Sequence, residues 1–177
     1  MKYINVVGTS ASGKSTFSKQ LARKLKLTYI ELDDLFWLDD WLESTDENFF
    51  LKLQQKIDIA TAGWVIDGNY TRTTAIKWKQ VDAIIWLDLP FHLNFLQSVQ
   101  RAFSRVLGQT QLWPSSNNRE NFARALGRDS IVWWMIKTHR KNRKKYLSMM
   151  RAPELQHIKF IQLKSRQQIQ DYLQQFD

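Results

Sequence analysis

The stretch "GTSASGKST", residues 8–16, decides the fold. It fits the pattern G-x-x-x-x-G-K-[ST], with Gly8, Gly13, Lys14 and Ser15 in the fixed positions. Glycines let backbone amides approach an anion closely, and amides in the first turn of a following helix attract negative charge. Lys14 adds a mobile cation for phosphate, and the Ser15 hydroxyl can ligate Mg²⁺. The stretch therefore predicts a phosphate-binding loop.

The flanking residues provide the setting that such a loop needs. Residues 2–7, "KYINVV", form a short apolar run that is typical of a buried strand. After the loop, Phe17, Leu21 and Leu25 recur every four residues, which predicts a helix with one apolar face. We expect nucleotide phosphates to contact the loop through Gly8, Ser10, Ala11, Ser12, Gly13, Lys14, Ser15 and Thr16.

The bulk composition is typical of one soluble globular domain over residues 1–177. Of these residues, 44% are hydrophobic and 24% are charged. The absence of cysteine excludes disulfides, thiolate metal sites and a cysteine nucleophile. No apolar run approaches the roughly 18 residues of a membrane span, and the first residues lack the layout of a signal peptide. We expect a cytoplasmic protein with no membrane partner.

The net charge of +9 is unevenly distributed along the chain. Residues 115–151 contain ten lysines and arginines against two acids, whereas residues 31–47 contain eight acids and no base. One surface should attract phosphates and another should repel them. Among the bases we expect Arg119, Arg140 and Arg143 to contact nucleotide phosphate.

The rest of the chain alternates between predicted strands and helices. This alternation predicts an α/β fold in which helices flank a parallel sheet on both faces. Further strands are expected within 27–32, 63–67, 81–90 and 157–164. Further helices are expected from an N-cap at Thr45 or Asp46, over 91–108, near 119–127 and 129–151, and after a cap at Ser165. Residues 33–44 and 109–118 are predicted to be loops, the second of them mobile.

Polar side chains follow the predicted strands at their carboxyl ends, where parallel sheets bind ligands. Asp33 closes the second strand. We expect it to take a proton from a hydroxyl of the molecule that receives phosphate, called the acceptor below, or to bind polar groups of that acceptor. We also place Asp34, Trp37, Trp41, Asn69 and Arg72 at the acceptor. Asp88, before Pro90, is interpreted as a structural residue at a strand end, and Trp64 and Trp86 as core residues.

Several segments together resemble adenylate-kinase-like P-loop kinases. The order of the motifs carries this resemblance: the loop at 8–15, "WVIDGNY" at 64–70, "VDAIIWLDLP" at 81–90 and "RAFSR" at 101–105. The combination of "LDDLFW" at 32–37, Trp41 and "IDGNY" at 66–70 is similar to the bacterial proteins labelled "DNA topology modulation protein".

This resemblance implies a five-stranded sheet in the order 2-3-1-4-5, an acceptor-binding insert at 31–62 and a lid at about 109–128. It implies that Asp67 reaches Mg²⁺ through water, beside Ser15, and that Arg101 and Arg105 grip the nucleotide phosphates near Lys14. One departure concerns the acceptor: such kinases have an arginine four residues after this aspartate, and here Thr71 takes that position, with Arg72 next to it.

The predicted function is transfer of the γ-phosphate of Mg·ATP to a small-molecule acceptor. Two alternatives stay open from the sequence. The basic 115–151 segment suggests a nucleic-acid-binding regulator with an ATP-dependent switch, which we do not favour because an acidic face accompanies it. The fold resemblance also suggests a nucleoside monophosphate kinase. The identity of the acceptor and the oligomeric state do not follow from the sequence.

Overall fold

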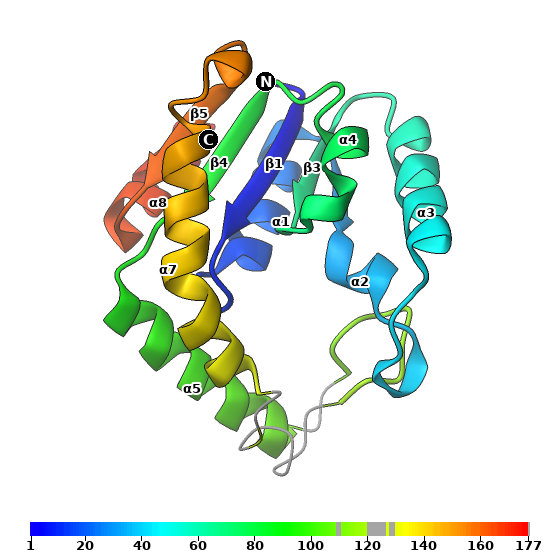
Figure 1. Ribbon diagram of the computed structural model, residues 1–177, viewed down its shortest axis with the longest axis vertical. Helices are drawn as coiled ribbons and strands as arrows, with labels where there is room; N and C mark the ends of the chain where they lie inside the picture. Colours follow the sequence, from blue (N-terminus) through cyan, green and yellow to red (C-terminus); the bar gives the residue numbers. More distant parts are fainter. Residues whose placement is uncertain (109–110, 120–126, 128–129, 177) are drawn as a thin grey trace.

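Five parallel strands form the centre of the structure, a computed structural model that describes residues 1–108, 111–119, 127 and 130–176 (Figure 1). The strands are β1 (Tyr3–Gly8), β2 (Thr28–Glu31), β3 (Trp64–Asp67), β4 (Ala83–Leu87) and β5 (Lys159–Leu163). Their order in the sheet is β2-β3-β1-β4-β5, as predicted. In the β1–β3 register Tyr3 pairs with Trp64 and Val6 with Asp67, so the strands end at a common edge.

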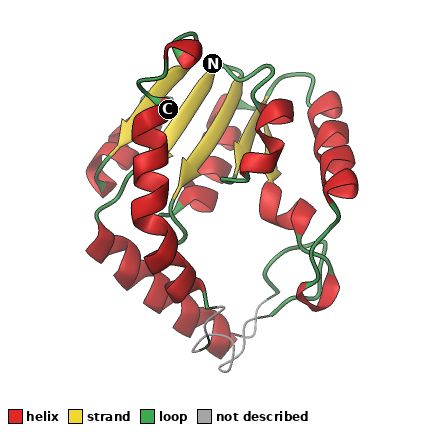
Figure 2. Ribbon diagram, in the orientation of Figure 1, coloured by secondary structure: helices red, strands yellow, loops and turns green. Residues whose placement is uncertain are grey.

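Helices cover both faces of this sheet (Figure 2). They are α1 (Lys14–Leu25), α2 (Leu32–Phe36), α3 (Asp46–Ile59), α4 (Thr74–Lys77), α5 (Phe91–Gly108), α7 (Ile131–Met149) and α8 (Arg166–Gln174). Three short 3₁₀ turns complete the elements: η1 (Asp39–Trp41), η2 (Thr71–Thr73) and η3 (Pro153–Leu155). No helix in the described part of the chain is long and apolar enough to cross a membrane.

Each strand alternates its side chains between two separate hydrophobic clusters, as the pleat requires. On one face Trp64, Ile66 and Trp86 pack with side chains of α3 and α7. On the other face Val65 and Ile85 pack with side chains of α1 and α8. Trp64 and Trp86 have 0% and 2% of their surface exposed, which confirms that both belong to the core.

The helix caps follow the sequence closely. The Thr45 hydroxyl accepts from the backbone N–H of Asn48 at 3.3 Å and caps α3. Ser165 caps α8 in the same way through Gln168, at 3.1 Å. Each cap satisfies a backbone donor that the helix leaves unpaired, which explains why these helices begin where predicted.

The structure corrects the loop prediction for residues 33–44 at two places, and it does not test one helix prediction. Residues 32–36 form α2 rather than a loop, because Leu32, Leu35 and Phe36 share one buried helical face. Residues 39–41 form η1. The helix predicted near 119–127 lies outside the described residues except at its two ends, and so does half of the lid predicted at about 109–128.

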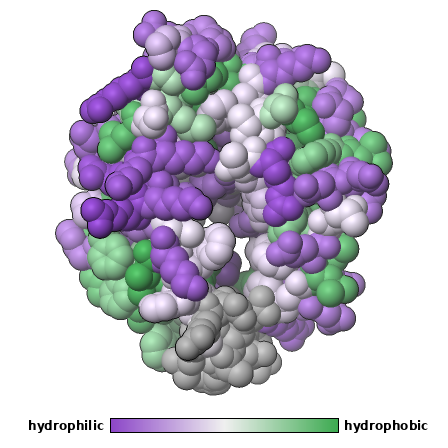
Figure 3. Space-filling model, viewed as in Figure 1, coloured by the Kyte–Doolittle hydropathy of each residue, from purple (hydrophilic) through white to green (hydrophobic). Residues whose placement is uncertain are grey.

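The carboxyl ends of the strands, the loop after β1 and the insert that begins at α2 gather at one end of the molecule (Figure 1). Helices α5 and α7 pack against each other and extend beyond the sheet at this end. Figure 3, in the same view as Figure 1, shows a hollow in the middle of the molecule. Hydrophilic side chains gather on the left of this hollow. Functional side chains from distant parts of the sequence therefore meet here.

Candidate active site

The phosphate-binding loop has the predicted strand-loop-helix geometry. Gly13 is the N-cap of α1, with φ at +86°, and it supplies no side-chain cap to the first turn. The amides of this turn are therefore left for another acceptor, which in such loops is phosphate. Lys14 begins α1, and its Nζ reaches back to within 3.4 Å of the Thr9 carbonyl oxygen.

Close packing explains the first glycine of the motif. A Cβ atom on Gly8 would lie 2.8 Å from the carbonyl oxygen of Leu87 and 2.8 Å from the hydroxyl of Ser12. Contacts this short force neighbouring backbone to move, so no other residue type fits without a shift of β4 or of the loop. The glycine thus sets how closely the loop returns to the sheet.

A buried carboxylate, Asp67, lies beside this loop at the end of β3. It is 4% exposed, and Tyr29 donates its hydroxyl to Oδ2 at 3.3 Å. Oδ1 has no hydrogen-bond partner among the described residues. Burial raises the pKa of Asp67, while the charge of Lys14 and a hydrogen bond from Ser15 lower it. An unpaired buried oxygen next to Ser15 and Lys14 is costly unless something binds it.

A second acid, Glu31, faces the same place from the end of β2. It is in register with Asp67 across the β2–β3 pair. Burial raises the pKa of Glu31, and Lys19, whose Nζ lies 3.5 Å from Oε2, counteracts this. The two carboxyl groups and the Ser15 hydroxyl form an oxygen-rich corner that fits Mg²⁺, a hard cation that takes one or two carboxylates and keeps several waters.

The structure separates the two aspartates that were predicted together at the acceptor. Asp33 Oδ1 accepts a 2.7 Å hydrogen bond from the Tyr70 hydroxyl. Asp34 instead accepts from the backbone N–H of Ser115 at 3.1 Å and from its hydroxyl at 2.8 Å. Asp33 therefore lies against the turn after β3, whereas Asp34 lies against the segment 111–119.

The predicted acceptor tryptophans, Trp37 and Trp41, contact each other at 5.8 Å between ring centroids. Both also pack on Trp113, which the sequence analysis had not associated with the site. Trp37 and Trp113 are stacked at 6.2 Å with an interplanar angle of 14°, and Trp41 meets Trp113 edge-on at 5.8 Å. The three rings fasten the segment 111–119 to the insert.

Polar contacts reinforce this fastening. Asn118 accepts from the Trp41 N–H at 2.7 Å and donates to the Leu38 carbonyl at 2.8 Å. Asn117 accepts from the Asp40 N–H at 3.0 Å. Asp40 and Trp41 both have a positive φ, near 56° and 61°, which costs energy for non-glycine residues and is held here by the asparagines.

The predicted phosphate-binding arginines occupy different surroundings. Arg101 and Arg105 lie one turn apart on α5, and both are half-buried. Arg119 is exposed and lines a hollow of about 640 Å³ that shares no residue with the phosphate loop. Arg140 is exposed on α7. Arg119 therefore lines a hollow separate from the phosphate loop, and the contact of Arg119 and Arg140 with nucleotide phosphate stays a prediction.

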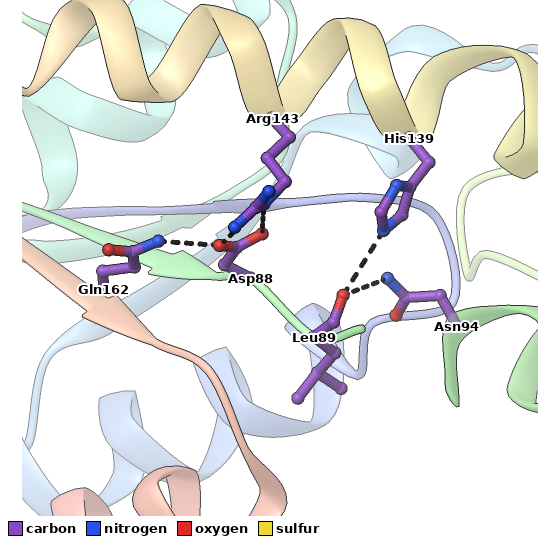
Figure 4. Close-up of polar contacts among 6 residues, drawn as sticks. All are labelled: Asp88, Leu89, Asn94, His139, Arg143 and Gln162. Atoms are coloured by element: carbon purple, nitrogen blue, oxygen red, sulfur yellow. Dashed lines mark hydrogen bonds and ion pairs between the residues drawn. The ribbon is translucent and has the colours of Figure 1, made fainter. Parts of the chain in front are cut away.

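Arg143 contacts a strand end instead. Its Nε lies 3.2 Å from both carboxylate oxygens of Asp88, and Gln162 donates to Asp88 at 2.7 Å (Figure 4). One helical turn earlier, His139 Nε2 lies 3.4 Å from the carbonyl oxygen of Leu89. These contacts tie α7 to the end of β4, which agrees with a structural role for Asp88 and favours the same for Arg143.

Two other predicted acceptor residues are engaged within the chain. Arg72 pairs with Asp46 at 2.7 Å, and its guanidinium lies over the ring of Phe36 at 4.8 Å. The Asn69 side chain bonds both backbone groups of Gly8, so the structure favours a positioning role for Asn69 over direct contact with an acceptor.

Sequence reasoning missed Tyr29 and Tyr70, which bond the predicted carboxylates Asp67 and Asp33, and Glu31, which stands beside Asp67 in the strand register. A signal existed for Glu31, because it stands at the end of the second predicted strand as Asp67 does at the end of the third. The two tyrosine contacts join residues 38 and 37 positions apart and have no local signature.

Comparison with solved structures gives the architecture a context. A shikimate kinase from Acinetobacter baumannii in complex with shikimate matches 99% of this chain and 90% of its own, with a TM-score of 0.56 and 16% identity. A gluconokinase from Sinorhizobium meliloti 1021 matches 99% and 89%, with a TM-score of 0.54 and 13% identity. A sugar kinase from Janibacter sp. HTCC2649 matches 98% of this chain and 93% of its own, with a TM-score of 0.52 and 17% identity. The chain has the fold of P-loop kinases.

Sequence relatives match only part of the chain. "Uncharacterized protein YqaC" of Bacillus subtilis (strain 168) is 24% identical over 104 residues, which are 59% of this chain and 58% of that protein. A shikimate kinase of Sulfurihydrogenibium sp. (strain YO3AOP1) is 31% identical over 104 residues, 50% of this chain and 61% of that protein. The chain thus spans about three fifths of the length of these relatives. No known protein-family profile matches it.

Proposed function

We propose that this chain is a P-loop kinase that transfers the γ-phosphate of ATP to a hydroxyl group of a small molecule. The observation that carries the proposal is the meeting of three parts at one edge of the sheet. These are the amide-rich loop with Lys14, the buried unpaired oxygen of Asp67 beside Ser15, and Asp33 held by Tyr70. Phosphoryl transfer needs mainly such positioning and charge neutralisation.

On the nucleotide side, the loop amides of residues 8–16 and Lys14 hold the phosphates in place. Arg101 and Arg105, one turn apart on α5, would bring positive charge to the transferred group. Ser15 and Asp67, with Glu31 beside them, would hold Mg²⁺. When bound, this ion neutralises phosphate charge that develops during the transfer.

On the acceptor side, Asp33 accepts the proton of the acceptor hydroxyl as the new oxygen–phosphorus bond forms and the bond to ADP breaks. The pKa of Tyr70 is raised by burial and, further, by the nearby charge of Asp33, so Tyr70 stays a hydrogen-bond donor at neutral pH. The donor bond to Oδ1 keeps the Asp33 carboxylate in one orientation.

The acceptor itself is proposed to carry no phosphate. Arg72, the arginine nearest the expected clamp position, is paired with Asp46. Thr71 holds that position and accepts from Lys145 at 2.6 Å, a single lysine whose pKa is lowered by burial. Glu43 lies near Tyr70 as a further acid. At an effective dielectric of about 20, each acid ~8 Å from a phosphate charge disfavours it by about 2 kcal/mol.

The similar proteins are consistent with this acceptor class. Their names include shikimate kinase, gluconokinase and sugar kinase, and shikimate and gluconate bear hydroxyl groups without phosphate. The narrower resemblance to the proteins labelled "DNA topology modulation protein" stays a hypothesis and assigns no acceptor.

Calorimetric titration with Mg·ADP measures whether the phosphate loop binds nucleotide. We expect Lys14→Ala to weaken binding by about tenfold or more, because it removes the cation that contacts the phosphates. The control is Lys79→Ala, which removes an exposed lysine away from the loop and should bind like wild type. Equal affinity of wild type and Lys14→Ala would contradict the assignment.

The acceptor class is tested by supplying Mg·ATP with AMP, CMP, UMP, GMP or dTMP in turn. We expect no efficient formation of a diphosphate from any of them. Turnover of one nucleotide with kcat/KM near ~10⁴ M⁻¹s⁻¹ or above would reject the unphosphorylated acceptor and support a nucleoside monophosphate kinase instead.

A further inference from the structure

The turn at residues 68–70 touches both halves of the candidate active site. The Asn69 side chain donates to the Gly8 carbonyl oxygen at 2.5 Å and accepts from the Gly8 N–H at 3.0 Å. It thereby pairs with both backbone groups of the residue that opens the phosphate loop. The next residue, Tyr70, donates its hydroxyl to Asp33 at 2.7 Å. Adjacent side chains of one turn thus contact the nucleotide side and the acceptor side.

The order of the strands explains why this turn has that position. The phosphate loop follows β1 and Asp33 follows β2, but β3 lies between these strands in the sheet. The end of β3 is therefore the part of the sheet that can reach both. Phosphoryl transfer requires the donor phosphate and the acceptor hydroxyl to be held close to one another in a defined orientation.

Buried polar groups hold the turn itself in place. Lys77, 2% exposed, donates from Nζ to the carbonyl oxygen of Tyr70 at 3.1 Å and lies 3.4 Å from that of Gly68. Asn5, fully buried on β1, donates to the Gly68 carbonyl at 3.3 Å. Tyr146 of α7 donates to Asn69 at 3.1 Å. A turn held from β1, α4 and α7 has little freedom to move.

Aromatic packing likewise holds the Tyr70 ring. Its centroid lies 5.0 Å from that of Phe36 and 5.1 Å from that of Phe49, and Phe49 is fully buried. The ring therefore presents its hydroxyl to Asp33 from a packed base rather than from a mobile side chain.

We propose that Tyr70 is a positioning residue that holds Asp33 toward the acceptor, while Asn69 in the same turn holds the phosphate loop at a set distance from it. This inference rests on the proposed kinase function, and it assigns Tyr70 a role that no motif indicates. Tyr70 acts through Asp33 and needs no contact with the substrate.

The first test measures whether Tyr70 acts through Asp33, without relying on activity. A double-mutant cycle of Tyr70→Phe and Asp33→Ala is measured by urea unfolding. We expect loss of the Tyr70 hydroxyl to change the unfolding equilibrium constant about tenfold when Asp33 is present and less than about twofold in the Asp33→Ala background. The matched control is Tyr172→Phe, far away on α8, which should be additive with Asp33→Ala. An additive cycle for Tyr70 overturns the inference.

The second test separates the two halves of the site. We expect Tyr70→Phe to lower kcat/KM for the acceptor about 10- to 100-fold while Mg·ADP affinity stays within about twofold. Asn69→Ala should weaken Mg·ADP about tenfold, because the phosphate loop loses its support, and Tyr172→Phe should change neither quantity.

Two results would contradict this role. One is acceptor kinetics of Tyr70→Phe equal to wild type; the other is Mg·ADP affinity reduced as much as in Asn69→Ala. Wild-type protein that shows the Tyr70–Asp33 coupling but phosphorylates no acceptor would overturn the proposed function, and with it the role of Tyr70. An additive cycle in an active kinase overturns the role of Tyr70 alone.

Discussion

Replacement of Lys77 by methionine should remove the increase in the free energy of unfolding with pH that burial of this lysine causes. Lys77 is 2% exposed, and burial lowers the pKa of its ammonium from 10.5 to about 7, with a further contribution from the charge of Lys145. The folded chain therefore binds fewer protons than the unfolded chain between these two values. Since stability rises with pH wherever the unfolded state binds more protons, this lysine makes the protein more stable as pH increases through that window.

The magnitude follows from the two pKa values. Between about pH 7 and about pH 9.5, the cost of burying Lys77 falls by about 3 kcal/mol. Lys77→Met has nearly the same shape and no charge. The carbonyl oxygens that Lys77 contacts keep other donors, because Asn5 donates to Gly68 and Thr73 donates to Tyr70. The substitution should therefore remove the charge term without leaving these oxygens unpaired.

The assay is urea unfolding of both proteins, followed by circular dichroism at several pH values. We expect the free energy of unfolding of wild type, minus that of Lys77→Met, to rise by about 3 kcal/mol across the window. Tyrosine ionisation occurs in both proteins and cancels in the difference. The exposed control Lys79→Met should give a flat difference. A flat difference for Lys77→Met as well would show that burial does not lower the pKa of Lys77.

Three further predictions concern neighbouring parts of the site. Gly68→Ala should cost about 1–3 kcal/mol in urea unfolding, because φ is +142° and a Cβ would lie 2.9 Å from that of Leu32; wild-type stability would argue against a strained turn. Arg143→Met should lower the free energy of unfolding by about 1–2 kcal/mol, because Asp88 is 9% exposed and loses a charged partner; the loss is limited because Arg143 itself is about half exposed. No change in stability at neutral pH would show that Gln162 alone is a sufficient partner for Asp88. Asn118→Ala should speed amide hydrogen exchange in η1 about tenfold, because the turn loses its side-chain acceptor; unchanged exchange would show that the ring contacts alone hold it.

The sequence predicted those parts of the fold that rest on local patterns. The residues of the phosphate loop have a fixed spacing. Strands such as residues 83–87 are short apolar runs in which every residue is buried. The caps at Thr45 and Ser165 are local side-chain contacts. The sheet order came from the resemblance, because parallel strands joined by helices leave several orders open. The structure confirms it.

The sequence failed where contacts join distant segments. The short helix α2 has five residues, too few for a helical period to stand out among its acids. Trp113 meets Trp37 across 76 positions, and nothing in a turn-rich segment marks that contact in advance. Asn69 is predicted at the acceptor, and the structure adds that its side chain bonds Gly8, because a one-dimensional pattern does not reveal which way a side chain in a turn points.

The proposed reaction is phosphorylation of an unphosphorylated hydroxyl compound. The most direct measurement is ³¹P NMR of wild-type protein with Mg·ATP and a panel of polyols, sugars and hydroxy acids, with Lys14→Ala as the inactive control. We expect one compound to yield a phosphomonoester signal that grows together with ADP, in wild type and not in Lys14→Ala. Release of inorganic phosphate alone with every compound, or formation of a nucleoside diphosphate from a monophosphate, would contradict it.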